Sequence, residues 1–249
     1  EQHKDNAATY LNRLNAVAPV LTHFDRLLNI SSQRTLQLND EFLEETGFVV
    51  PVSVDGNAIT VLQQLTAKLP AWADLEGAEA SSLWAGRELD ETNSRSWLGA
   101  DGDGPFFIKG RMIGRFTVQD NPTERVCKAN WSSPTSVNMT RIVWRDVSRP
   151  SQKRRVIAAI IPDGIVAGNS LGVAFFRDNN QTALRALLGV MSSLVFEFQL
   201  RSHLATGHVS LSSLRKVRVP SREHLERLSS VSEEVERLLN KPSRSQARL

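Results

Sequence analysis

The pattern of apolar and polar positions divides the chain into a helical start, a strand-rich centre and a helical end. Apolar residues recur at spacings of three and four in residues 6–30, which predicts an amphipathic helix that Pro19 bends or divides. Residues 47–54 predict a strand with a proline, typical of a sheet edge. A short helix over 59–69 is expected to stop at Pro70.

Short β-rich runs between 105 and 176 predict a small sheet. Polar or glycine-containing turns separate the runs "PFFI", "RMIGRFTV", "TRIVWRDV", "RVIAAII", "GIVAG" and "LGVAFF", whereas 71–104 predicts mainly loops. One long helix is expected over 181–204, and a last helix is expected to start at its cap, Ser221. The predicted class is α+β, with a small mixed, largely antiparallel sheet and long flanking N- and C-terminal helices.

Composition narrows the class of protein without indicating a chemistry. The chain has 249 residues, 41% hydrophobic and 23% charged, with a formal charge of +3 and a pI near 9.3. The single cysteine, Cys127, excludes an internal disulfide and fits a reducing, cytoplasmic setting. No apolar run has the length of a membrane span. Because the chain begins without Met and directly in a helical pattern, we expect a fragment of a longer protein.

Positive charge is concentrated in one stretch, "RIVWRDVSRPSQKRR" (141–155). Strand alternation places Arg141, Val143 and Arg145 on one face, and Trp144 on the other face is expected in the core. We therefore expect a hairpin whose tip and one edge are cationic. Arginine suits phosphate oxygens and guanine edges because its guanidinium is planar and donates in pairs. The alternative is an ordinary solvated face, with Arg141 and Arg145 paired to Glu88, Asp90 or Glu124.

Motifs of common catalytic sites are missing from the sequence. It has no glycine-rich phosphate loop, no pair of histidines at metal-ligand spacing and no G-x-S-x-G elbow. Pro162-Asp163 followed by Glu197-Phe198-Gln199 has the spacing of a metal-dependent nuclease site. Since Glu197 lies in a helical pattern and Asp163-Gly164 is typical of a turn, we expect structural roles for both.

Three stretches taken together resemble one family. They are "IKGRMIGRF" (108–116), "RIVWRDVSRPSQKRRVIAAIIPDGIVAGNS" (141–170) and "LLGVMSSLVFEFQLRSHLATGHVSLSSLRKVRVP" (187–220). Their order resembles the C-terminal target-recognition domain, TaqI-like specificity domain included, of adenine-specific DNA methyltransferases and type IIG restriction–modification enzymes. The resemblance covers about residues 45–225.

The resemblance implies a bacterial module that docks in the major groove of double-stranded DNA and selects the sequence for a separate catalytic domain. It divides the chain into a helical connector (1–45), a DNA target-recognition domain (46–220) and a C-terminal helix and tail (221–249). Neither "NPPY" nor a glycine motif for S-adenosylmethionine is present, so the resemblance places that cofactor and the catalysis upstream in a parent phage-defence enzyme. The DNA-facing residues that it implies are Lys109, Arg111, Arg115, Arg141, Arg145, Arg149, Lys153, Arg154, Arg155, Asn169, Ser170, Arg201 and His208.

Structural alternatives remain open for Asn169 and for the two apolar stripes. Asn169 is alternatively a turn residue in the left-handed conformation. The apolar stripes at 10–28 and 228–238 suit either a protein-interaction module or helices that pack on each other as the frame of the domain. No residue of this chain is expected to bind a metal or cofactor.

Overall fold

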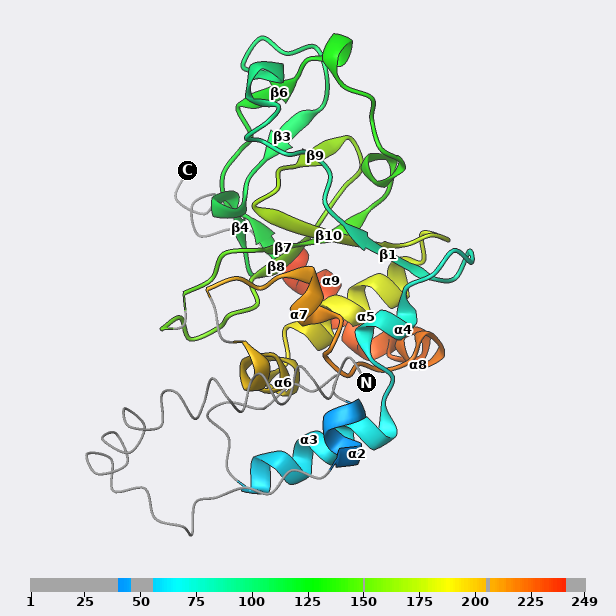
Figure 1. Cartoon of the computed structure of the whole chain (residues 1–249). Helices are drawn as coiled ribbons and strands as arrows, with labels where there is room; N and C mark the ends of the chain where they lie inside the picture. Colours follow the sequence, from blue (N-terminus) through cyan, green and yellow to red (C-terminus); the bar gives the residue numbers. More distant parts are fainter. Residues whose placement is uncertain (1–39, 46–55, 150, 205–206, 241–249) are drawn as a thin grey trace, which may run out of the picture. The chain divides into compact units, whose positions relative to one another are not determined.

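Strands in the described part of the chain form three sheets (Figure 1). Helices cover one face of the central sheet, which contains the strands Arg141–Arg145 and Leu171–Phe176. The structure is a computed structural model that describes residues 40–45, 56–149, 151–204 and 207–240. The predicted helix 6–30 and strand 47–54 lie outside these residues. The described elements confirm the α+β class, with largely antiparallel pairing and flanking helices.

The central sheet has the order β1-β10-β7-β8, and all its neighbouring strands are antiparallel. Alternate residues face opposite layers: Ile142 and Ala174 join the core under the helices, whereas Val143 and Val173 join a cluster on the other face. All residues of the last strand are buried, as expected for an uninterrupted apolar run between two layers. The strands are β1 (Leu83–Gly86), β7 (Arg141–Arg145), β8 (Ala158–Ile161) and β10 (Leu171–Phe176).

A second sheet lies on the face of the central sheet opposite the helices (Figure 1). Its order is β2 (Leu98–Gly99), β6 (Glu124–Val126), β3 (Phe106–Ile108) and β9 (Ile165–Ala167), with β3 and β9 parallel. A separate hairpin of β4 (Ile113–Gly114) and β5 (Thr117–Val118) turns at Arg115-Phe116, where Phe116 has φ 60°.

The helices that cover the central sheet begin at side-chain caps. Asn180, Ser193, Ser210 and Ser221 each accept a hydrogen bond from a backbone amide in the first turn of α5, α6, α7 and α8. Gly189 permits close approach of α9, because a Cβ there would lie 2.5 Å from Val231. The described helices are α2 (Asp40–Glu45), α3 (Gly56–Lys68), α4 (Trp72–Leu75), α5 (Gln181–Met191), α6 (Leu194–His203), α7 (Leu211–Leu214), α8 (Arg222–Arg227) and α9 (Ser229–Leu239).

The expected single helix over 181–204 is wrong in one respect, since α5 and α6 meet at a bend of 61°. The apolar period continues across Ser192-Ser193, but the Ser193 hydroxyl caps a new helix there. No single helix in the described part has the length and hydropathy to cross a membrane, and only the bent pair passes that test. Most apolar side chains of the pair, Leu187 and Phe196 among them, fill the main core.

Some of the other predicted helices and strands are confirmed and others are wrong. The helix before Pro70, the cap at Ser221 and the runs that form β3, β7, β9 and β10 are confirmed. "RMIGRFTV" forms a 3-10 turn and a hairpin and not one strand. The strands β1, β2 and β6 were not predicted. The stripe on α9 packs against the core through Val235 and Val231, which fits its role as part of the frame of the domain.

The close contact of Gly172 with Trp144 generates a stability prediction. A Cβ at Gly172 would lie 2.1 Å from the Trp144 ring, which is fully buried and donates to the Val209 carbonyl oxygen. We expect Gly172→Ala to lower the free energy of unfolding by about 1–3 kcal/mol, as overpacking does. Urea unfolding followed by tryptophan fluorescence measures it. Gly99→Ala is the control, because nothing lies within 4 Å of its Cβ position; equal losses in both variants would contradict the packing argument.

Candidate nucleic-acid interface

The connection between β7 and β8 carries the basic segment singled out from the sequence. The two strands pair antiparallel, with Val143 opposite Ala159, so the predicted hairpin is confirmed. The second strand starts later than expected because the backbone amides of Arg155 and Val156 donate to the Glu197 carboxylate, at 2.7 and 3.2 Å. The return of the connection is therefore fixed to α6.

Four arginines lie close to Glu197 or to one another. Arg201 donates through Nε to Glu197 Oε1 at 2.6 Å and through Nη2 to the carbonyl of residue 152 at 2.7 Å. Arg154 Nη1 lies 3.4 Å from the carbonyl oxygen of residue 193. We call the set Arg115, Arg154, Arg155, Arg201 and Glu197 the arginine cluster; its formal charge is +3.

The electrostatics of the arginine cluster favour an anion. Burial and the charge of Arg154 hold the pKa of Arg115 below its ordinary value, while Glu197 opposes them. Burial and the charge of Arg201 lower the pKa of Arg155 in the same way. Arg115 is exposed and the Arg201 side chain is 37% exposed, so an anion can reach both. Its charge would relieve the mutual repulsion of the guanidinium groups.

Further cations extend the arginine cluster across the surface. Arg149 and Lys153 are exposed on the β7–β8 connection, and Arg111 is exposed before β4. Their side chains make no hydrogen bond or ion pair with the residues that the structure describes. We call these three residues and the arginine cluster the basic surface.

A polar network lies where β7 ends. Asp146 accepts from Arg87 Nη2 at 2.8 Å and binds His208 Nδ1 at 2.9 Å. The Asp146 carbonyl also accepts from the backbone amide of Val209 at 2.6 Å. The His208 side chain is 61% exposed. His208 and Val209, which follow α6, are thus held beside the end of β7.

Asn169 and Ser170, predicted to face DNA, have partners inside the fold. Asn169 Nδ2 donates to Asp90 Oδ1 at 3.0 Å, and Ser170 Oγ accepts from the Gly110 backbone amide at 2.9 Å. Both residues are half-buried. Asn169 is not among the described residues with positive φ, so the left-handed alternative is wrong. These two side chains hold the turn before β10.

The prediction that Arg141 contacts DNA is corrected by its burial. Its side chain is 0% exposed and forms a two-point ion pair with Glu88, at 2.7 and 3.1 Å, which was the alternative foreseen from the sequence. It also donates to the carbonyl oxygens of Met139, Pro162 and Ile165. A guanidinium with these acceptors and no exposed surface has nothing left to offer DNA.

Three more predicted contacts are corrected for related reasons. Arg155 is 3% exposed, so its contribution is charge within the arginine cluster and not a direct contact. Lys109 Nζ lies 2.6 Å from Glu91 and 2.8 Å from Glu124; burial lowers its pKa, but these hydrogen bonds and charges raise it overall. Arg145 is half-buried and donates to a carbonyl oxygen of β4 at 2.6 Å.

The nuclease alternative finds no support in the geometry. Asp163 is exposed in a turn before Gly164, whose φ is 73°. Glu197 is buried in α6 and its carboxylate is taken up by two backbone amides and Arg201. The described residues contain no group of three or more His, Cys, Asp or Glu side chains able to hold a metal ion.

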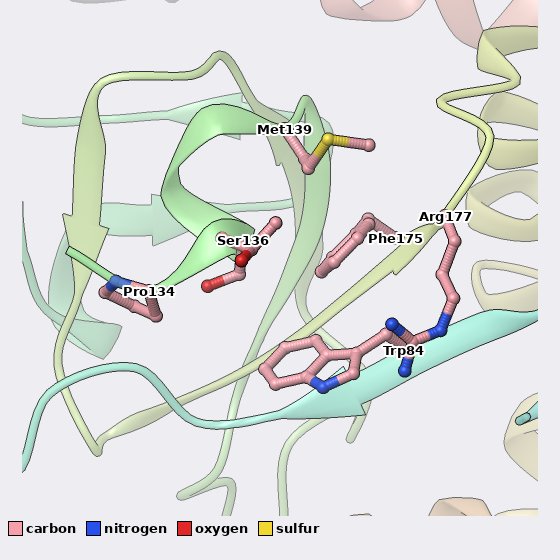
Figure 2. Close-up of a pocket in the computed structure, with 7 residues that line it drawn as sticks. Trp84, Pro134, Ser136, Met139, Phe175 and Arg177 are labelled. Carbon is pink, nitrogen blue, oxygen red and sulfur yellow. The ribbon is translucent and has the colours of Figure 1, made fainter. Parts of the chain in front are cut away.

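A pocket of about 300 Å³ lies at the β1 edge of the central sheet (Figure 2). Trp84 and Phe175 form one wall, with ring centroids 5.3 Å apart, and Ser136, Met139 and Arg177 line the rest. The strands β1 and β8 are opposite edges of this sheet. The pocket therefore does not belong to the basic surface.

The sequence did not predict the role of Glu197, whose carboxylate binds the β7–β8 connection and Arg201. One signal was present, because Glu197 and Arg201 are four residues apart on one helix face, the spacing of a stabilising pair. Its bonds to the Arg155 and Val156 amides span more than 40 positions, and local patterns carry no trace of them.

The buried ion pair generates a second stability prediction. We expect Glu88→Ala to lower the free energy of unfolding by about 3–5 kcal/mol, because it leaves the Arg141 charge buried without its counterion. Urea denaturation measures the loss. Glu223→Ala removes an exposed partner of Arg227 and should change stability by less than about 1 kcal/mol. Equal effects of the two variants would show that the Arg141 guanidinium reaches water.

Comparisons with known proteins supply no family. No family model matches the sequence, and no curated protein matches it. One solved structure, described as the basis of complex assembly and conformational transition of the type I R-M system, is 15% identical, with a TM-score of 0.38 over 94% of this chain and 54% of that chain. The HsdS subunit from Thermoanaerobacter tengcongensis is 13% identical, with a TM-score of 0.38 over 95% of this chain and 54% of that subunit. The chain spans about half the length of either structure, and similarity at this level carries no functional conclusion.

Proposed function

We propose that this chain is a double-stranded DNA recognition module of a restriction–modification or phage-defence DNA methyltransferase. The observation that carries the proposal is the arginine cluster, in which one carboxylate, that of Glu197, lies among four arginines and bonds to the guanidinium of Arg201 alone of the four. The order of the three motif stretches, which resembles a target-recognition domain, favours duplex DNA over other polyanions. We base the proposal on these two features and not on the two solved structures.

Phosphate contacts would supply most of the affinity. Guanidinium groups bind phosphate oxygens in pairs, and each neutralised phosphate releases condensed counterions, so affinity falls as salt rises. Arg115, Arg154, Arg149 and Lys153 are the best placed for these contacts, since all have exposed or half-exposed side chains. Sequence selection would come from side chains that reach base edges in the groove.

In this proposal the module itself is non-catalytic. Upstream methyltransferase or nuclease domains of a longer bacterial, cytoplasmic protein would bind S-adenosylmethionine and act on the site that the module selects. The use of Glu197 to hold the connection after β7 supports a structural and not a catalytic part for this carboxylate.

The salt dependence of binding tests the proposal. We expect the logarithm of the association constant for duplex DNA to fall linearly with the logarithm of the salt concentration. The triple variant Arg115→Gln, Lys153→Gln and Arg154→Gln should reduce that slope by about 2 to 3, because each lost phosphate contact removes about 0.9. Fluorescence anisotropy with a labelled duplex over a salt series measures both slopes.

The matched control replaces exposed arginines outside the basic surface. Arg227→Gln and Arg237→Gln remove side chains that are 69% and 66% exposed and paired to acidic residues on α8 and α9. Their slope should equal that of the unaltered chain. Binding that does not respond to salt, or equal slopes in the triple variant and the unaltered chain, would contradict the proposal.

A DNA cleavage assay tests the proposal that the module is non-catalytic. Supercoiled plasmid incubated with the chain and Mg²⁺ or Mn²⁺ should stay supercoiled, because no described carboxylate cluster can hold the metal. Nicking that disappears in Asp163→Ala would instead identify a nuclease.

A further inference from the structure

Two large apolar side chains stand exposed at the start of α6. Leu194 is 71% exposed and Val195 is 52% exposed. The other large apolar residues in the described part that are exposed are Val61, at 44%, and Val147, at 58%. Leu194 is the most exposed of the four, and it is followed directly by another. Two adjacent exposed apolar side chains are a candidate contact surface, because covering them would be favourable.

The pair lies inside the basic surface. Ser193, the cap of α6, offers its carbonyl oxygen to Arg154 Nη1. Helix geometry places Leu194 on the side of α6 that carries Arg201 seven positions later, whereas Val195 is turned by about 100° from Leu194. The 61° bend between α5 and α6 makes the first turn of α6 a corner of the fold and not the continuation of a buried helix. The guanidinium of Arg154 therefore lies beside the residue that directly precedes the apolar pair.

We propose that Leu194 and Val195 contact the C5-methyl group of thymine when the first turn of α6 enters the major groove. This inference rests on the proposed DNA recognition and adds a base contact to it. A phosphate bound by Arg154 would bring the first turn of α6, with its two apolar side chains, to the groove beside it. The thymine methyl is the apolar group that the major groove presents, and the groove is wide enough for an α-helix. The positive end of the α6 dipole also faces the phosphates favourably.

A second protein is the competing occupant of the same apolar pair. The formal charge of +3 in the arginine cluster favours a polyanion over an ordinary protein surface. A protein contact at Leu194 and Val195 would overturn the inference.

The test compares thymine with uracil, which differs by the methyl group alone. Bound duplexes are first selected from a random pool with the full chain, and each thymine of the selected site is then replaced by uracil. At least one replacement should weaken binding about fourfold, the value of one buried methyl group. The double variant Leu194→Ser with Val195→Ser should bind the thymine and uracil duplexes equally, with its salt slope unchanged. Circular dichroism confirms that this surface variant folds.

Val61→Ser is the matched control, because it removes an exposed apolar side chain from α3 and should keep the preference for thymine. Salt-dependent binding without any preference for thymine would overturn this inference and leave the proposed function standing. A preference that survives in the double variant would also overturn it. So would a double variant that sediments as a smaller species than the unaltered chain, because the pair would then serve a protein contact. Absence of salt-dependent binding in the unaltered chain would overturn the proposed function and the inference together.

Discussion

The buried ion pair of Glu88 and Arg141 joins the two four-stranded sheets. Arg141 belongs to β7 of the central sheet, and it donates to a carbonyl oxygen in β9 of the second sheet. Glu88 accepts from the Ala167 backbone amide of β9 at 2.8 Å. Removing two charges from water is costly, and it is tolerated here because every partner is within hydrogen-bond distance. The pair fixes β7, and β7 in turn fixes where the basic connection leaves the sheet.

A second carboxylate, that of Glu197, does for the surface what Glu88 does for the core. It binds the amides of Arg155 and Val156 and the side chain of Arg201, so the connection and α6 are held together. This one negative charge pairs with Arg201 and leaves the arginine cluster with a formal charge of +3. The excess positive charge does not stabilise the fold, since like charges repel, and the proposed function gives it an anionic partner.

Sequence patterns predicted those parts of the fold in which local chemistry decides the structure. The turn at Asp163-Gly164, the cap at Ser221 and the apolar strand β10 follow from residue type and period alone. The period could not reveal the bend at Ser193, because apolar positions stay in phase across it. Short strands such as β2 and β6 were not predicted, because two or three residues are too few to show an alternation of apolar and polar positions.

The cations of the basic surface were all among the predicted residues, but the role of Glu197 was not predicted and Arg141 was wrongly included. The basic connection was identified from its composition, yet strand alternation assigned Arg141 to an exposed face. Its partner Glu88 lies 53 positions away, and tertiary contacts of that range reverse a local expectation. Arg115 joins the arginine cluster because the β4–β5 hairpin brings it beside Arg154, which no local signal indicates. Arg154 and Arg155 carry the same charge, but only Arg154 is exposed enough to contact DNA directly.

Hydrogen–deuterium exchange with and without duplex DNA tests the central claim most directly, because it maps the contact along the whole chain. The account predicts that DNA slows exchange in the β7–β8 connection (146–157), the β4–β5 turn and the first turn of α6, with no change around Trp84 and Phe175. Protection that is confined to the β1 edge, or no protection in the connection under conditions where DNA binds, would contradict it.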